Sequence, residues 1–90
     1  MQHDQDVVND LIRRMRKIEG QARGIVKMLE EGRECEAVLM QLAAMKAGIN
    51  KVGMKALGCQ LGKVMSQEIV EGGDGSEALE QMMDTFLNFA

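Results

Sequence analysis

Residues 35–59 read CEAVLMQLAAMKAGINKVGMKALGC, and their apolar side chains recur at alternating spacings of three and four. That spacing is the heptad rhythm of a helix that packs along one side. The series consists of Cys35, Val38, Leu42, Met45, Ile49, Val52, Ala56 and Cys59. No proline interrupts the chain. We therefore expect this helix to run to about Glu71, where Gly72 and Gly73 end it.

A long helix is also predicted upstream of this stretch, because a second apolar series has the same spacing. Its members are Val8, Leu11, Met15, Ile18, Ala22, Ile25 and Leu29. The helix is expected to end near Gly32, with Asp4 or Asp6 as the N-cap.

A short third helix is predicted downstream, with Asp74 or Ser76 as its cap. Its apolar side consists of Leu79, Met82, Met83 and Phe86. No segment has the alternating pattern of a strand. The sequence therefore predicts an all-α fold of three helices, in a single domain that spans residues 1–90.

The small size of the chain predicts self-association. Of the 90 residues, 46% are hydrophobic, but only two are aromatic, so few large side chains can fill a core. A domain of this size has a limited core of its own. We therefore expect an oligomer.

The two cysteines lie at opposite ends of one apolar stripe. Twenty-four positions correspond to roughly 36 Å along a helix, so Cys35 and Cys59 cannot meet within one straight helix. In an antiparallel symmetric pair with its twofold axis at Ala47, Cys35 would face the partner's Cys59. The axis would lie among small residues, which permit close approach of two helices: Ala43, Ala44, Ala47 and Gly48. Alternatively, both cysteines are small buried hydrophobic side chains.

Charge is unevenly distributed, although the formal net charge is only −3. Six cations lie between Leu11 and Lys27, against one acid, Glu19. They are Arg13, Arg14, Arg16, Lys17, Arg23 and Lys27. Lysines alone follow between Ala37 and Gln67, and every charge after Lys63 is acidic. This segregation predicts a basic face on an acidic protein, and the alternative is a set of ordinary solvated helix faces.

The segment LIRRMRKIEGQARGIVKMLEEGREC, residues 11–35, resembles the first helix of the CsoR/RcnR/FrmR family of bacterial repressors. The matching residues are Arg14, Lys17, Ile18, Gly20, Gln21 and Gly24, followed by Cys35. The continuation CEAVLMQLAAMKAGINKV is similar to the family's second helix, so the resemblance covers nearly the whole chain.

The resemblance implies an antiparallel dimer of long helices and a dimer of dimers, a homotetramer. It also implies repression of transcription through operator DNA bound by a broad basic face. Arg14 and Lys51 match basic positions of the family. Charge and helix position alone add five further candidates, which are Arg13, Arg16, Lys17, Arg23 and Lys55. Phosphate contacts from these residues would make binding depend steeply on salt.

The sensor positions depart from the family's copper pattern. Copper sensors use a cysteine at the head of the second helix with a histidine and a second cysteine of the partner. Cys35 matches the first, whereas Gln60 and Val64 occupy the other two positions. Cys59 precedes Gln60, and the sequence leaves open which of the two faces Cys35 of the partner. His3 resembles the N-terminal histidine of nickel sensors, and the alternative is a solvated residue in the N-terminal tail.

Three inducers are considered, all acting at Cys35. The leading hypothesis is a reactive sulfur species such as a persulfide, read by Cys35 and the partner's Cys59. The second is Cu(I) or another soft metal held by the same two thiols. The third is formaldehyde, which in this family is read by Cys35 and the amino terminus. No resident cofactor is required.

The sequence also bears on other classes of protein. The polar start, MQHDQDVVND, does not resemble a secretory signal, and no apolar run reaches the roughly 20 residues that span a membrane. Two cysteines in such a chain indicate a reducing compartment, so we expect a cytoplasmic protein. No nucleophile with a neighbouring base is evident, so we expect no enzyme. A helical scaffold or metal carrier that never touches DNA is the alternative outside the repressor class.

Overall fold

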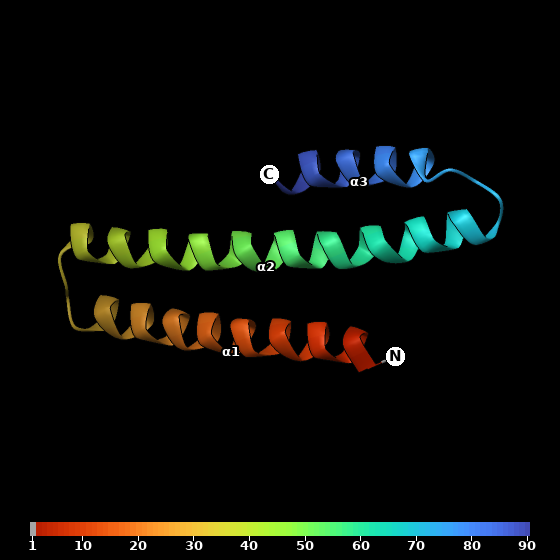
Figure 1. Cartoon of the computed structure of the whole chain (residues 1–90). Coiled ribbons are helices and arrows are strands. Elements are labelled where there is room, and N and C mark those ends of the chain that lie inside the picture. Colours follow the sequence, from red (N-terminus) through yellow and green to blue (C-terminus); the bar gives the residue numbers. More distant parts are fainter. Residues whose placement is uncertain (1) are drawn as a thin grey trace. The chain divides into compact units, whose positions relative to one another are not determined.

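A computed structural model describes residues 2–90, with side chains from residue 5 onward, and contains three helices. They are α1 (Gln2–Glu30), α2 (Cys35–Val70) and α3 (Ser76–Phe89) (Figure 1). Residues 2–90 contain no strand, so the predicted all-α fold is confirmed. The chain divides into an N-terminal unit, through Val52, and a C-terminal unit, Gly53–Ala90. A single domain over residues 1–90 stays a prediction.

The turn between α1 and α2 follows from a glycine in the left-handed conformation. Gly32 has φ 71°, which a residue without a Cβ adopts at little cost. Its N–H donates to the carbonyl of Leu29 at 3.2 Å, and the N–H of Arg33 donates to that of Met28 at 2.9 Å. These two bonds form a Schellman motif, which satisfies the last carbonyls of α1. The helix ends at Glu30, close to the predicted end near Gly32.

The same motif ends α2, as its two glycines predict. Gly72 has φ 94°, and its N–H donates to the carbonyl of Ile69 at 3.0 Å. The N–H of Gly73 donates to the carbonyl of Glu68 at 2.8 Å. The helix ends at Val70, one residue before the predicted boundary.

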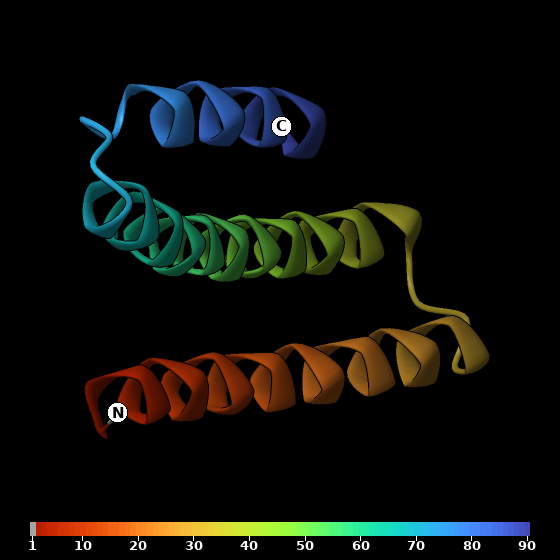
Figure 2. The ribbon, with the colours of Figure 1, turned by 90° about the vertical axis from the view of Figure 1, so that its right-hand side faces the viewer.

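In the N-terminal unit, α1 runs antiparallel to the first half of α2 (Figures 1 and 2). Three residues of the predicted apolar series form the core, since Ile18, Ile25 and Val38 are each only 7% exposed. The side chain of Ile18 lies against Gly48, where an added Cβ would be 3.5 Å from Cγ1 of Ile18. This is an ordinary van der Waals distance, so Ile18 packs over position 48 where α1 and α2 meet.

Much of the predicted apolar series remains exposed within one chain. The exposed large hydrophobic residues of the N-terminal unit are Val8, Ile12, Met15, Val26, Leu29, Leu39, Met40, Leu42 and Ile49. Five of them belong to the two series that the sequence predicts to be apolar stripes. An apolar groove of about 560 Å³ also runs along α1, between Val8 and Ala22. The N-terminal unit thus has an apolar surface that a single chain does not cover.

In the C-terminal unit, α3 packs beside the second half of α2 (Figures 1 and 2). Ala78 and Met82 are its buried residues, with Ala78 only 1% exposed. Near the other end of α3, the ring of Phe89 occupies the space above Gly53, where any Cβ would collide with it. Met83, which the sequence places on the apolar side, is exposed in this chain.

The predicted N-caps of α1 and α3 are wrong. Helix α1 begins at Gln2, upstream of both Asp4 and Asp6. The N-cap of α3 is Gly75, at φ 88°, rather than Asp74 or Ser76. A short polar residue was predicted there because its side chain can accept from the first turn. In the structure, carboxylates from outside the cap position take over that task.

Two carboxylates satisfy the first N–H groups of α3. Asp74 accepts a hydrogen bond from the backbone N–H of Ser76 at 3.0 Å. The pKa of the Asp74 carboxyl lies below its usual value. The main cause is this hydrogen bond from the backbone of Ser76, and the second is a hydrogen bond from the Ser76 side chain. Glu68 of α2 accepts from the N–H groups of Glu77 at 3.3 Å and Ala78 at 3.0 Å. A carboxylate here also suits the positive end of the helix dipole.

Replacement of Glu68 by alanine is expected to destabilise the docked α3. Two first-turn N–H groups lose their acceptor, and a lost helix cap typically costs about 1–2 kcal/mol. Amide hydrogen exchange at Glu77 and Ala78, together with thermal unfolding, measures the effect. Glu71→Ala is the control, because it removes the same charge from an exposed side chain three residues later. Equal protection in both variants would contradict the capping role.

None of the helices described here is both long and apolar enough to cross a membrane.

Candidate functional site

Four cations of the predicted basic face line one cleft in the N-terminal unit. The cleft has a volume of about 200 Å³ and lies between α1 and α2. Its lining residues are Arg13, Arg14, Lys17, Ile18, Gln21, Ala44, Gly48 and Lys51. Residues from two distant segments of the sequence thus converge on one concave cationic surface.

The spacing of the lining residues explains the cleft. On α1, positions 14, 17 and 21 are three and four apart, and so are positions 44, 48 and 51 on α2. Residues at these spacings share one face of a helix. The row on α1 and the row on α2 face each other where the helices pack. Ile18 of α1 lies next to Gly48 of α2 there. Because Ala44 and Gly48 are small, the space above them stays open between the charged side chains.

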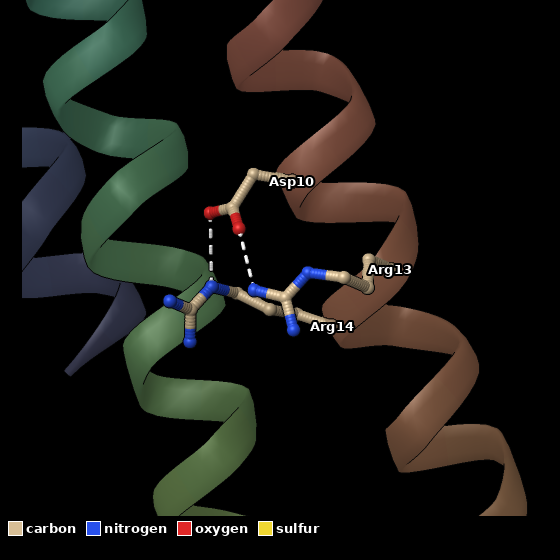
Figure 3. A network of polar contacts seen from close by, with 3 residues as sticks. All are labelled: Asp10, Arg13 and Arg14. Atoms are coloured by element: carbon tan, nitrogen blue, oxygen red, sulfur yellow. Dashed lines mark hydrogen bonds and ion pairs between the residues drawn. The ribbon is translucent and has the colours of Figure 1, made fainter.

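Asp10 holds two of the cleft arginines at once (Figure 3). Its Oδ1 accepts a hydrogen bond from Nη2 of Arg13 at 2.7 Å, and its Oδ2 accepts from Nε of Arg14 at 2.9 Å. Positions three and four along a helix lie on either side of the starting residue, so one carboxylate reaches both neighbours. Arg14 is the better enclosed, with a side chain 25% exposed against 68% for Arg13.

The remaining predicted cations do not line this cleft. Arg16 lines the apolar groove of α1 instead. Arg23 is exposed, with its Nη1 3.6 Å from Oε1 of Glu19. Lys55 is exposed and belongs to the C-terminal unit. Their DNA-binding roles stay predictions.

The sensor candidates lie at separate places on α2. Cys35 is the first residue of the helix and is exposed, whereas Cys59, in the C-terminal unit, is half-buried. Both are free thiols. Gln60 is exposed. The side chain of His3 lies outside the described residues, so its sensing role stays a prediction.

A family model described as metal-sensitive transcriptional repressor matches residues 8–88. The chain belongs to this family. It is 31% identical over 81 residues to the copper-sensing transcriptional repressor CsoR of Bacillus subtilis, covering 90% of this chain and 79% of the relative. It is 35% identical over 65 residues to the copper-sensing transcriptional repressor RicR of Mycobacterium tuberculosis, covering 72% and 68%.

A solved structure supports the same membership in the metal-sensitive repressor family. It is the crystal structure of the copper-sensing repressor CsoR with Cu(I) from Geobacillus thermodenitrificans. The match has a TM-score of 0.77 and 34% sequence identity, and it covers 91% of this chain and 84% of that chain. The predicted resemblance to the CsoR/RcnR family is therefore confirmed.

Membership in the metal-sensitive repressor family establishes the broad class of function. The relatives are transcriptional repressors, not enzymes, and a repressor of this kind acts on DNA. The alternative of a scaffold that never touches DNA is therefore not supported. The comparisons also favour a metal over a reactive sulfur species as the inducer, since the family description and the relatives name metal and copper.

The donor set of this family member fits a soft metal only in part. Among the residues that the structure describes, no three side chains of His, Cys, Asp or Glu form a group able to hold a metal ion in a single chain. Two thiols are present, and thiolate is the preferred ligand of Cu(I). Gln60 and Val64 add no soft donor.

The sequence analysis of this repressor did not identify two residues of this surface, one that lines the cleft and one that is bonded to two of its arginines. Gln21 lines the cleft and was noted only as part of the family motif. Asp10 was not singled out, although its spacing to Arg13 and Arg14 is the spacing of helical ion pairs. That spacing is the signal that could have identified it.

Proposed function

We propose that this chain represses transcription by placing the cationic cleft against the phosphates of operator DNA, and that an inducer acting at Cys35 releases it. The observation that carries the DNA-binding surface is the convergence of Arg13, Arg14, Lys17 and Lys51 on one cleft. Arginine and lysine side chains are the usual phosphate contacts of DNA-binding proteins. The fork of an arginine also matches two phosphate oxygens.

Gln21 completes this surface as an uncharged donor. Its side-chain amide lies among the cations of the cleft and can donate to a phosphate or to a base edge. The small side chains of Ala44 and Gly48 leave room for a phosphate to approach the helix backbone. The experiment that tests the surface is a titration of the protein's own upstream promoter DNA at several salt concentrations.

Replacement of Lys51 by alanine is expected to weaken promoter binding and to flatten its salt dependence. Each phosphate neutralised releases counterions, so the slope of log K against log salt should fall by about 0.9 for each Lys51 that contacts DNA. Fluorescence anisotropy of labelled promoter DNA between low and physiological salt gives the slope.

Lys46→Ala is the matched control for this experiment. Lys46 is an exposed lysine of the same helix and the same unit, but it does not line the cleft. We expect its slope to remain close to that of the unmodified protein. If Lys46→Ala and Lys51→Ala change the slope equally, the cleft is not the DNA surface.

We also propose that the chain assembles as a dimer of dimers. The uncovered apolar surface of α1 and α2 supports this, because isolated proteins rarely leave large apolar patches exposed. The core within one chain is small, since the buried hydrophobic residues among those described are Ile18, Ile25, Val38, Ala78 and Met82. Sedimentation velocity at several protein concentrations tests the proposal. A monomer at micromolar concentration would refute it.

For the inducer, we propose Cu(I) or another soft metal bound by Cys35 of one protomer and Cys59 of a second. Family membership supports a metal, and the chemistry of two thiolates supports a soft one. The exposed position of Cys35 at the helix head makes its thiol accessible. Gln60, next to Cys59, is exposed and is a candidate to face the same site.

A reactive sulfur species is the second candidate inducer. The observation in its favour is the donor set, because a persulfide reacts with two thiols and needs no third ligand such as a histidine. Intact-mass measurement of reduced protein separates the candidates. Exposure to a polysulfide would give a covalent dimer with added sulfur, whereas Cu(I) would give a metal adduct that a strong chelator removes. Formaldehyde, tested in parallel, would add carbon but neither sulfur nor metal.

A further inference from the structure

We propose that Asp10 is an internal counterion of the DNA surface, which competes with operator phosphates for Arg13 and Arg14 and so limits affinity and its salt dependence. The inference rests on the proposed function of the cationic cleft and adds a residue that opposes binding. It also assigns a role to the ion-pair group in which one carboxylate, Asp10, binds two arginines (Figure 3).

The carboxylate of Asp10 is bonded to two of the guanidinium groups that would contact a phosphate. Asp10 offers one oxygen to each arginine, 2.7 Å from Nη2 of Arg13 and 2.9 Å from Nε of Arg14. A phosphate also has several oxygens that accept hydrogen bonds from guanidinium groups, as a carboxylate does. Asp10 therefore already provides, inside the protein, the kind of contact that the DNA backbone would supply.

Charge explains the cost to DNA binding. The cleft has four cationic side chains, and the Asp10 carboxylate reduces their combined formal charge from four to three. The carboxylate is bonded directly to two of them, so it stays within a few ångströms of any phosphate that binds there. At such separations, like charges repel strongly enough to change an equilibrium constant several-fold.

The exposure of the two ion pairs indicates how they respond. Arg13 is 68% exposed, so its pair with Asp10 is screened by solvent and opens easily. Arg14 and Asp10 are 25% and 31% exposed, so that pair persists more strongly. Arg14 donates a hydrogen bond to Asp10 through its Nε. Its two Nη atoms have further N–H groups that can donate to a phosphate. The carboxylate thus remains beside Arg14 in the DNA complex, and its charge weakens binding in each complex formed.

The experiment is a salt titration of promoter binding by Asp10→Asn. The change removes the charge and keeps the shape of the side chain. We expect affinity to rise by roughly 3- to 10-fold at low salt. The slope of log K against log salt should steepen by about 0.9 for each protomer that contacts DNA. The matched control is Glu31→Gln, which removes the same charge from an acid beside Lys27, outside the cleft and outside the apolar groove. Its slope should be close to that of the unmodified protein.

The outcomes separate this inference from the proposed function. If the unmodified protein binds promoter DNA with no salt dependence, the proposed DNA surface is wrong. If it binds with a steep slope but Asp10→Asn leaves the slope unchanged or lowers affinity, only the counterion role is overturned. Thermal unfolding checks that the variant is folded. Asp10→Ser makes the same change in charge and takes the place of Asp10→Asn if that variant fails to fold.

Discussion

Replacement of Cys35 by alanine is expected to leave operator binding intact and to abolish release by the inducer. Cys35 is exposed at the head of α2 and does not line the cationic cleft, so its loss removes no phosphate contact. Moving the repressor from almost fully bound to almost fully free requires an inducer that favours the released state by about 10⁴-fold. That preference disappears with the thiol that receives the inducer. Promoter binding by anisotropy, with and without Cu(I), measures both properties.

Cys59→Ala is the control that defines the partner thiol. If the inducer joins the two thiols, this variant should also bind DNA and fail to respond. If Cys59→Ala responds normally and Cys35→Ala does not, Cys35 is the sensor. Gln60 then becomes the candidate to face it from the partner. A Cys35→Ala protein that is still released normally by Cu(I) would refute the sensing assignment.

Replacement of Ile18 by alanine is expected to cause a large loss of stability in the N-terminal unit. Ile18 is 7% exposed and lies against Gly48, where α1 and α2 approach each other. Truncation of a buried isoleucine typically costs about 2–5 kcal/mol, because it removes apolar contact and leaves a cavity. Urea unfolding followed by circular dichroism measures the free energy. DNA binding should weaken as well, because Ile18 also lines the cationic cleft.

Ile12→Ala is the matched control, because it makes the same truncation in the same helix. Ile12 is 45% exposed in the chain and lines the apolar groove. The loss in free energy of unfolding caused by Ile12→Ala should be small in a monomer. It should grow with protein concentration if the groove is an interface between copies. Equal, concentration-independent losses for Ile12→Ala and Ile18→Ala would contradict the placement of the core.

The helices could be predicted because heptad spacing and glycine punctuation act locally. Gly32 and Gly72 end their helices through positive φ angles and bonds to carbonyls a few residues back, and such signals are contained in short segments. The cap of α3 could not be predicted in this way. Its main acceptor, Glu68, comes from the preceding helix, nine and ten positions before the N–H groups that it satisfies. Contacts between elements leave no fixed spacing in the sequence.

The cationic cleft was predicted in part, and for a similar reason. The candidates Arg13, Arg14, Lys17 and Lys51 do converge, because charge and helical spacing place them on facing rows. Charge alone also nominated Arg16, whose helical position places it in the apolar groove. The proposed contact between the cysteines lies between two copies, so no contact within one chain determines it. That part of the site depends on the assembly of several copies. The sequence shows apolar stripes, but it does not show how a second copy packs against them.

The unbroken course of α2 has a mechanical consequence. Cys35 and Lys51 lie on the same helix within the N-terminal unit, sixteen positions or roughly 24 Å apart. They point in nearly opposite directions around its axis, because sixteen steps of about 100° leave roughly 160° between them. If a ligand binds at Cys35, we expect the continuous backbone of α2 to transmit its effect to Lys51. A tilt of only about 5° at the helix head would move Lys51 by roughly 2 Å, which is enough to break a hydrogen bond.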